Sequence, residues 1–145
     1  MLTPVEPKKN TATKGEASEC AILARLIASG YKCLIPWGHD HRYDIAIDHD
    51  GEFVRIQCKT ARYNKVRETV QFNTITTYAR VGGKPHLRKG YKGEADYFGV
   101  YCPEIGKVYL VPVEEMPDGG TGVLRLYPTK NSQQKGVRWA KDYEI

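Results

Sequence analysis

Residues Tyr43–Thr60 read YDIAIDHDGEFVRIQCKT, and this stretch decides how the chain folds. On both sides of the Asp-Gly pair at 50–51, apolar and polar side chains alternate with the period of two that is typical of half-buried strands. Asp-Gly favours a two-residue type I′ turn, because both central residues of that turn need a positive φ. The turn sets the register of the predicted hairpin, in which Asp44 lies opposite Gln57.

Lys59 stands two residues beyond Gln57 and therefore shares its face of the strand. One polar face of the hairpin thus gathers a carboxylate, an amide and an ammonium group. This cluster is the candidate functional centre of the chain.

A predicted helix supplies a further acidic residue. Thr13 is expected to be its N-cap, with Glu16 closing a capping box, and Gly30 is expected to end it. Glu19 falls within the apolar stripe of this helix, where a carboxylate is costly unless another group pairs with it. The alternative is a solvated Glu19 past the edge of the core, but the polar cluster on the hairpin favours the paired position.

Length and composition limit the possible classes of protein. The chain has 145 residues, 41% of them apolar, which suffices for a single domain over residues 13–145 after a flexible arm over residues 1–12. The net charge of +5 favours an anionic partner, nucleic acid first, although a surface that serves only solubility is the alternative. We find no signal peptide and no apolar run near the roughly 18 residues of a membrane span, so no membrane partner is expected.

The cysteine and histidine residues show no zinc-binding spacing. No pair among the four cysteines has CxxC spacing, so they are interpreted as reduced core thiols in a cytoplasmic protein. The four are Cys20, Cys33, Cys58 and Cys102. The His-Asp-His run at 39–41 is a weak metal-binding pattern, and we favour an exposed loop or a contact with DNA beside the site.

A basic span begins within the hairpin and continues beyond it. Residues 55–92 contain ten Lys or Arg residues against one acidic residue, Glu68, with aromatic residues between them. Charge gathered in one part of the chain indicates a nucleic-acid footprint. The residues expected to contact DNA are Arg62, Lys65, Arg67, Arg88 and Lys89.

Further strands are expected from the alternation of apolar residues and from the turn residues between them. They span residues 31–35, 68–78, 95–102, 107–113 and 123–127, and the glycine-rich segment 81–92 is expected to be a mobile loop. Pro112 makes the 107–113 segment an edge strand or marks its end.

The polar cluster has the composition of a site for a hard cation. The carboxylates of Glu19 and Asp44 and the amide oxygen of Gln57 form an all-oxygen set, which Mg²⁺ prefers. The backbone carbonyl of Cys58 can complete it. Lys59 on the same face can orient or deprotonate a water molecule, or neutralise charge on a phosphoryl transition state. These are the components of phosphodiester hydrolysis.

Three segments, in order along the chain, resemble the PD-(D/E)xK nuclease superfamily: Gly15-x-x-x-Glu19, Tyr43-Asp44-Ile45-Ala46-Ile47 and Arg55-Ile56-Gln57-Cys58-Lys59-Thr60. The archaeal-type Holliday junction resolvases are one similar branch. The other is the family of small endonucleases that includes a bacterial group I intron homing enzyme, in which Gln-x-Lys occurs. The resemblance implies an α/β, restriction-endonuclease-like core, with a central mixed β-sheet flanked by helices.

Carried over by position, the resemblance makes Glu19, Asp44 and Gln57 metal ligands and Lys59 the catalytic lysine. Glu16 is the rival to Glu19, but the G-x-x-x-E spacing selects Glu19. Gln57 in place of an acidic residue removes one negative charge from the site, so the choice between one metal ion and two stays open.

The expected function is hydrolysis of DNA phosphodiester bonds with Mg²⁺, or Mn²⁺ in its place, by an endonuclease of the Holliday-junction-resolving type. One alternative is a sequence-specific homing or restriction-type endonuclease of the same fold, and another is a non-catalytic DNA-binding module on a decayed nuclease fold. Branched or duplex DNA is the expected partner. Because one site cuts one strand, a homodimer or higher homo-oligomer is expected, with the 95–113 strands as its interface. The expected setting is the cytoplasm of a prokaryote, or a phage-encoded protein.

Overall fold

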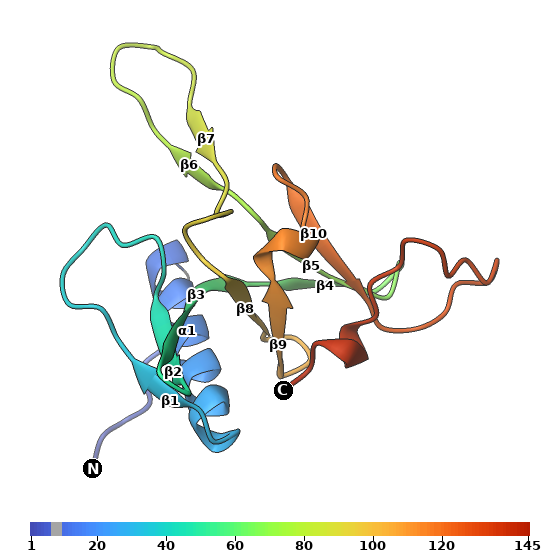
Figure 1. The fold of residues 1–145 in the computed structure, drawn as a ribbon, viewed down its shortest axis with the longest axis horizontal. Coiled ribbons are helices and arrows are strands. Elements are labelled where there is room, and N and C mark those ends of the chain that lie inside the picture. The colour runs from blue at the N-terminus through green and yellow to red at the C-terminus, as the bar shows by residue number, and fades with distance from the viewer. Residues whose placement is uncertain (7–9) are drawn as a thin grey trace.

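The computed structural model describes residues 1–6 and 10–145. Its centre is a five-stranded sheet with the strand order β1-β2-β3-β8-β9 (Figure 1). The strands are β1 (Lys32–Leu34), β2 (Ile45–His49), β3 (Glu52–Thr60), β8 (Tyr97–Cys102) and β9 (Lys107–Pro112). β3 and β8 pair in parallel and the other neighbours pair antiparallel, which confirms the predicted mixed sheet.

The β2–β3 hairpin has the predicted turn and register. Asp50 and Gly51 have φ values of 52° and 86°, as a type I′ turn requires. His49 pairs with Glu52 and Ala46 with Arg55.

Helix α1 (Thr11–Ala28) starts earlier than predicted. Its N-cap is Asn10, whose side chain accepts a hydrogen bond of 2.7 Å from the backbone N–H of Thr13. The prediction of Thr13 as N-cap is therefore wrong, because Asn is an equally good cap and stands three residues earlier. The flexible N-terminal segment expected over residues 1–12 is shortened accordingly, and its residues 7–9 lie outside the described part of the chain.

Helix α1 packs on one face of the central sheet. Ile22 and Leu26 are fully buried against Ile45 and Ile56. A Cβ atom at Gly99 would lie 2.8 Å from Ile22 Cγ2, so the glycine lets β8 approach the helix closely. This contact fixes α1, and with it Glu19, over the middle of the sheet.

The opposite face of the sheet is covered by a second, smaller sheet with the strand order β10-β5-β4. Its strands are β4 (Arg62–Asn64), β5 (Thr69–Asn73) and β10 (Thr121–Arg125). Phe72 packs edge-on against Phe98, with the ring centroids 5.6 Å apart. Of the expected flanking helices, the described residues contain one α-helix, α1, accompanied by two 3₁₀ turns, η1 (Val113–Glu115) and η2 (Ala140–Asp142).

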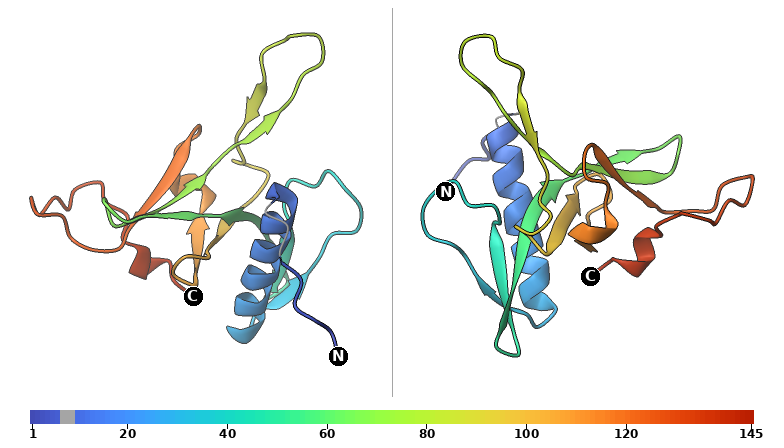
Figure 2. Two further views of the ribbon diagram at one scale, coloured as in Figure 1. Left: turned by 180° about the vertical axis from the view of Figure 1, so that it is seen from behind. Right: turned by 45° about the horizontal axis from the view of Figure 1, so that its top comes forward.

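A third, two-stranded sheet projects from the body as an arm (Figures 1 and 2). It consists of β6 (Thr76–Tyr78), β7 (Leu87–Lys89) and the loop between them. The predicted strand over 68–78 is divided into β5 and β6. The break falls at Thr74, which is buried and whose hydroxyl donates to backbone carbonyls of the 117–120 loop. The predicted mobile loop over 81–92 is also corrected, since it contains β7.

The C-terminal residues cover the open edge of β9. Leu110 N donates to Tyr143 O at 2.8 Å, and Ile145 N donates to Val108 O at 3.1 Å. Among the described residues, β8 is enclosed between β3 and β9, and the edge of β9 is bonded at Val108 and Leu110 to the C-terminal residues, which limits strand pairing through the 95–113 segment. The edge position of the strand that ends at Pro112 is confirmed.

All four cysteines are unpaired thiols, but the prediction that all lie in the core is wrong for Cys20, which is exposed on α1. Cys58 and Cys102 are buried and Cys33 is half-buried. Among the described residues, no helix has the length and apolar character that crossing a membrane requires.

Candidate active site

Asp44 and Gln57 meet where the β2–β3 hairpin opens. Asp44 precedes β2, and its Oδ2 atom accepts hydrogen bonds of 2.7 Å from Gln57 Nε2 and 2.7 Å from the backbone N–H of Cys58. Gln57 Nε2 also donates to the Cys58 carbonyl at 3.3 Å. The structure therefore brings the Asp44 carboxylate, the Gln57 amide and the Cys58 carbonyl to one point.

Asp44 and Glu19, the two carboxylates of the candidate site, come from the position directly before β2 and from α1 respectively. Burial raises the pKa of the Asp44 carboxyl, while the Cys58 N–H and the Lys59 charge oppose this shift. Partial burial also raises the pKa of the Glu19 carboxyl, and the charges of Asp44 and Glu16 add to the effect. Glu19 itself is more exposed than the stripe position predicted for it, because Ser18 and Ile22 are the buried residues of this part of α1. Glu19 is near enough to Asp44 for the two charges to interact, but no hydrogen bond joins them in the described part of the chain.

The donor set fits a hard divalent cation. The Gln57 amide hydrogens occupy a position within hydrogen-bond reach of both Asp44 Oδ2 and the Cys58 carbonyl, which is where a positive charge is best placed. Rotation of this amide would present its oxygen to an ion held by Asp44 and Cys58. Burial raises the pKa of the Cys58 thiol, so this residue can contribute its carbonyl oxygen but no thiolate. When bound, such an ion polarises the scissile phosphate and lowers the pKa of a bound water.

No cluster of three or more His, Cys, Asp or Glu side chains suited to a metal occurs in residues 1–6 and 10–145. The candidate site remains the predicted one, with two carboxylates plus amide and carbonyl oxygens. The His-Asp-His run at 39–41 is exposed, and His41 Nε2 is bonded to the Trp37 carbonyl at 2.7 Å.

Lys59 reaches the site from the same strand, but its ammonium group is held by other elements. Nζ lies 3.2 Å from the Tyr91 hydroxyl and 3.4 Å from the Ile75 carbonyl, and donates to both. It also lies 4.4 Å from the centroid of the Tyr91 ring. In the sequence, Tyr91 is one of the aromatic residues within the basic span, and nothing local connects it to Lys59. Their contact is therefore a result of the tertiary structure.

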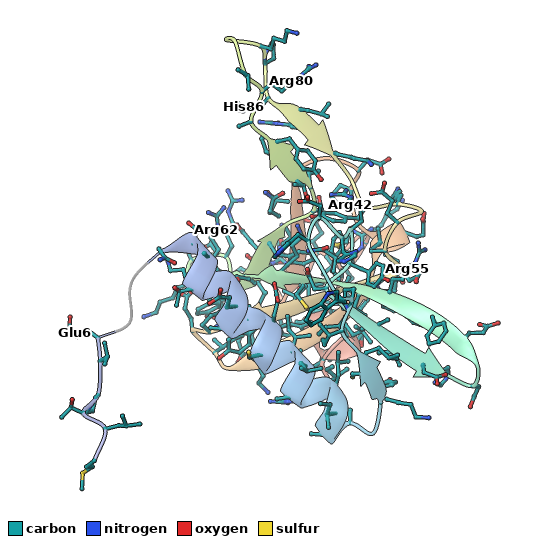
Figure 3. The ribbon with its side chains drawn as sticks, turned by 90° about the vertical axis from the view of Figure 1, so that its left-hand side faces the viewer. Glu6, Arg42, Arg55, Arg62, Arg80 and His86 are labelled. Carbon is teal, nitrogen blue, oxygen red and sulfur yellow. The ribbon has the colours of Figure 1, made fainter. Side chains whose placement is uncertain are left out.

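Arg42 is a second residue that the sequence interpretation missed. Its guanidinium lies 4.1 Å from the centroid of the Tyr91 ring and donates to Glu94, to the Thr76 and Tyr78 hydroxyls and to the Gly90 carbonyl. The one available signal was its place two residues before Asp44. Figure 3 shows Arg42 at the base of the arm, whose loop carries Arg80 and His86.

The five basic residues expected to contact DNA fall in three places. Arg62 and Arg88 line a cavity of about 940 Å³ that extends from the first turns of α1 to the base of the arm. Lys65 and Arg67 line a separate hollow of about 660 Å³ beside β10. Lys89 pairs at 2.6 Å with Glu94, a carboxylate that it shares with Arg42.

A family model described as PD-(D/E)XK endonuclease matches residues 9–145. The chain belongs to this family. Membership of this family implies that the protein is a nuclease with DNA as its substrate. Nucleases of this family generally use divalent metal ions.

Among solved structures, the PD-(D/E)XK endonuclease is similar to a bacterial homing endonuclease, I-Ssp6803I, with a TM-score of 0.74 and 20% identity. The match covers 93% of this chain and 88% of the other. It confirms the restriction-endonuclease-like fold. No curated protein matches the chain.

Proposed function

We propose that this protein is a Mg²⁺-dependent endonuclease that reads sequence in duplex DNA. The observation that carries the proposal is the arm, a two-stranded ribbon that projects beside the candidate active site (Figure 2). The major groove of B-DNA admits a two-stranded β-ribbon, and base pairs are distinguishable there. A ribbon next to a hydrolytic site suits cleavage at a recognised sequence better than recognition of junction shape.

The charges of the arm support this role. Arg80 and Lys84 lie in its exposed loop, and Arg88 lies on β7 facing the cavity that Arg62 also lines. No ion pair is formed by these four residues within the described part of the chain, whereas Arg55, Lys89 and Lys92 are paired. Unpaired positive charge is thus present on the arm and on the adjacent cavity wall, where phosphates would be bound.

In the proposed reaction, Glu19, Asp44, Gln57 and the Cys58 carbonyl hold the divalent ion. Lys59 either orients the attacking water or neutralises the charge that develops on the phosphate. Arg62 and Arg88 bind the DNA backbone beside the site. Two cuts in a duplex require two such sites, so the proposal includes a homodimer or higher homo-oligomer.

The test uses a pool of linear duplexes with a randomised centre and a four-way junction built from the same arms. With Mg²⁺, the protein should cut a recurrent sequence in the duplex pool, and Mn²⁺ should substitute. Cutting of the junction alone, without sequence preference, would instead establish the Holliday-junction-resolving function. Salt-dependent binding without any cutting in Mg²⁺ or Mn²⁺ would establish the non-catalytic module.

A matched pair of lysine variants shows whether cleavage belongs to this site. Lys59→Met removes the ammonium from the site, and Lys141→Met removes an equal charge from the exposed surface of η2. Lys59→Met should abolish cleavage with binding largely retained, and Lys141→Met should cleave like the wild type. Equal activity of the two variants would place catalysis elsewhere.

A further inference from the structure

The position of the Lys59 ammonium depends on one tyrosine from outside its strand. Tyr91 lies between β7 and β8, and its hydroxyl is 3.2 Å from Lys59 Nζ. The remaining hydrogen-bond partner of Nζ, at 3.4 Å, is the carbonyl of Ile75, which stands directly before the arm. Both partners of the candidate catalytic lysine thus come from the two ends of the arm.

Tyr91 is itself held firmly. It is 5% exposed, its ring packs edge-on against Phe98 with centroids 5.7 Å apart, and its hydroxyl is hydrogen-bonded to Thr76 of β6. A buried tyrosine with a satisfied hydroxyl is a rigid support for a flexible lysine.

Arg42 joins the same ring to the arm. Its guanidinium stacks on Tyr91 and donates to Thr76 and Tyr78 of β6 and to the carbonyl of Gly90 after β7. Glu94 accepts from both Arg42 and Lys89 and closes the network. The base of the arm and the lysine of the active site therefore share one set of contacts, centred on Tyr91.

We propose that Tyr91 is a positioning residue for Lys59, and that Arg42 couples this position to the arm. This inference rests on the proposed function, because it assigns a role to Lys59 in cleavage and to the arm in DNA binding. A shift of the arm when it seats on DNA would move Thr76 and the Ile75 carbonyl, and with them the frame that holds the ammonium. Binding energy from the arm is thereby linked to the rate of the chemical step.

Tyr91→Phe tests the positioning role, because it keeps the ring and removes the hydroxyl. The single-turnover cleavage rate constant should fall about ten-fold, which corresponds to about 1.4 kcal/mol, while the Kd for DNA and the melting temperature stay near the wild-type values. Tyr109→Phe is the matched control, because Tyr109 is fully buried and its hydroxyl has no hydrogen-bond partner among the described residues. A Tyr91→Phe variant that cleaves like Tyr109→Phe would overturn the proposal.

The coupling role is tested by Arg42→Gln, alone and combined with Tyr91→Phe. If Arg42 acts through Tyr91, the double variant should lose little more cleavage rate than Tyr91→Phe alone. Fully additive losses would show that Arg42 does not act through Tyr91 and would overturn the coupling.

A spectroscopic measurement tests the positioning without any cleavage. In ¹⁵N-labelled protein at low temperature, an ordered Lys59 ammonium should give a resolved side-chain resonance, assigned by its loss in Lys59→Arg. This resonance should broaden or vanish in Tyr91→Phe and persist in Tyr109→Phe. If the wild type cuts no DNA, the proposed function fails, and this experiment alone decides whether Tyr91 holds Lys59. An unchanged resonance in Tyr91→Phe would overturn the inference.

Discussion

Two hairpins of the chain, β2–β3 and the β6–β7 arm, are stabilised in opposite ways. The β2–β3 hairpin closes through a two-residue turn, and its apolar residues Ile45, Ile47 and Ile56 are buried under α1. The β6–β7 arm closes through residues 79–86, and all three residues of β7 are exposed. The first hairpin is therefore held by its own turn and by the core, and the second by polar contacts at its base.

Two neighbouring carboxylates, Asp96 and Glu94, each secure one of the two hairpins. Asp96 accepts from the guanidinium and the backbone N–H of Arg55 on β3 and so secures the first hairpin to β8. Glu94 accepts from Arg42 and Lys89 and so secures the arm. The first hairpin carries the candidate site, and the second, which is held by polar contacts at its base, is the element that the proposed function assigns to DNA recognition.

The largest expected effect is on the first hairpin. Asp44→Asn should reduce cleavage more than about a hundred-fold, because it removes a candidate metal ligand. Its stability without metal at pH 7 should equal or exceed that of the wild type. Burial raises the pKa of Asp44 in the folded state, so ionisation destabilises the wild type as the pH rises from the unfolded pKa through the folded one. Cleavage assays and thermal melting check both statements, and a marked loss of melting temperature would contradict the second.

The next effect is on the arm. Replacing residues 79–86 by Asn-Gly should shorten the arm to a two-residue hairpin, because Tyr78 and Leu87 are directly paired. The loss of Arg80 and Lys84 should reduce the slope of log K against log salt by about 1.8. Thermal melting should be unchanged, since none of the removed residues is buried. An unaltered salt slope would show that the arm does not touch phosphate.

A smaller effect distinguishes the two carboxylates. Asp96→Asn should destabilise the protein by at most about 1 kcal/mol at pH 7, because a half-exposed, charge-assisted bond to Arg55 is lost, whereas Glu94→Gln should weaken DNA binding. The hydrogen bond from Arg55 lowers the pKa of Asp96 in the folded state. Its contribution is therefore present above the unfolded pKa of about 3.9 and is lost as the pH falls through the folded value. Melting curves of wild type and Asp96→Asn should converge below about pH 4, and a constant difference would contradict this origin.

The smallest effect compares two turns. Gly51→Ala should cost about 1 kcal/mol, because φ is 86° in the turn that sets the β2–β3 register. Gly82→Ala changes a residue with a similar φ of 78° in the loop of the arm. Because that loop can rearrange without disturbing the core, its global stability in chemical denaturation should stay at the wild-type value. Equal losses in the two variants would show that the arm folds as part of the core.

Local sequence was sufficient for the β2–β3 hairpin but not for the arm. The Asp-Gly turn and the alternating apolar residues were enough to predict the β2–β3 hairpin and its register, including the pairing of Ala46 with Arg55. The loop of the arm contains Gly82-Gly83, with φ values of 78° and 68°, but its β7 strand, Leu-Arg-Lys, carries no alternation that separates it from a basic loop. The start of α1 was misplaced for a similar reason, since Asn10 and Thr13 are both acceptable caps and the choice depends on packing.

The candidate site likewise depends partly on local sequence and partly on long-range contacts. The sequence by itself determined the order of Glu19, Asp44, Gln57 and Lys59 and the hairpin that puts two of them face to face, because turn chemistry and strand period act over a few residues. Only the tertiary structure decided what holds Lys59, since Tyr91 and Ile75 contact it, and Arg42 contacts Tyr91, from segments that no local pattern connects. Long-range contacts of this kind depend on how the sheet and the arm pack, and packing is a property of the whole chain.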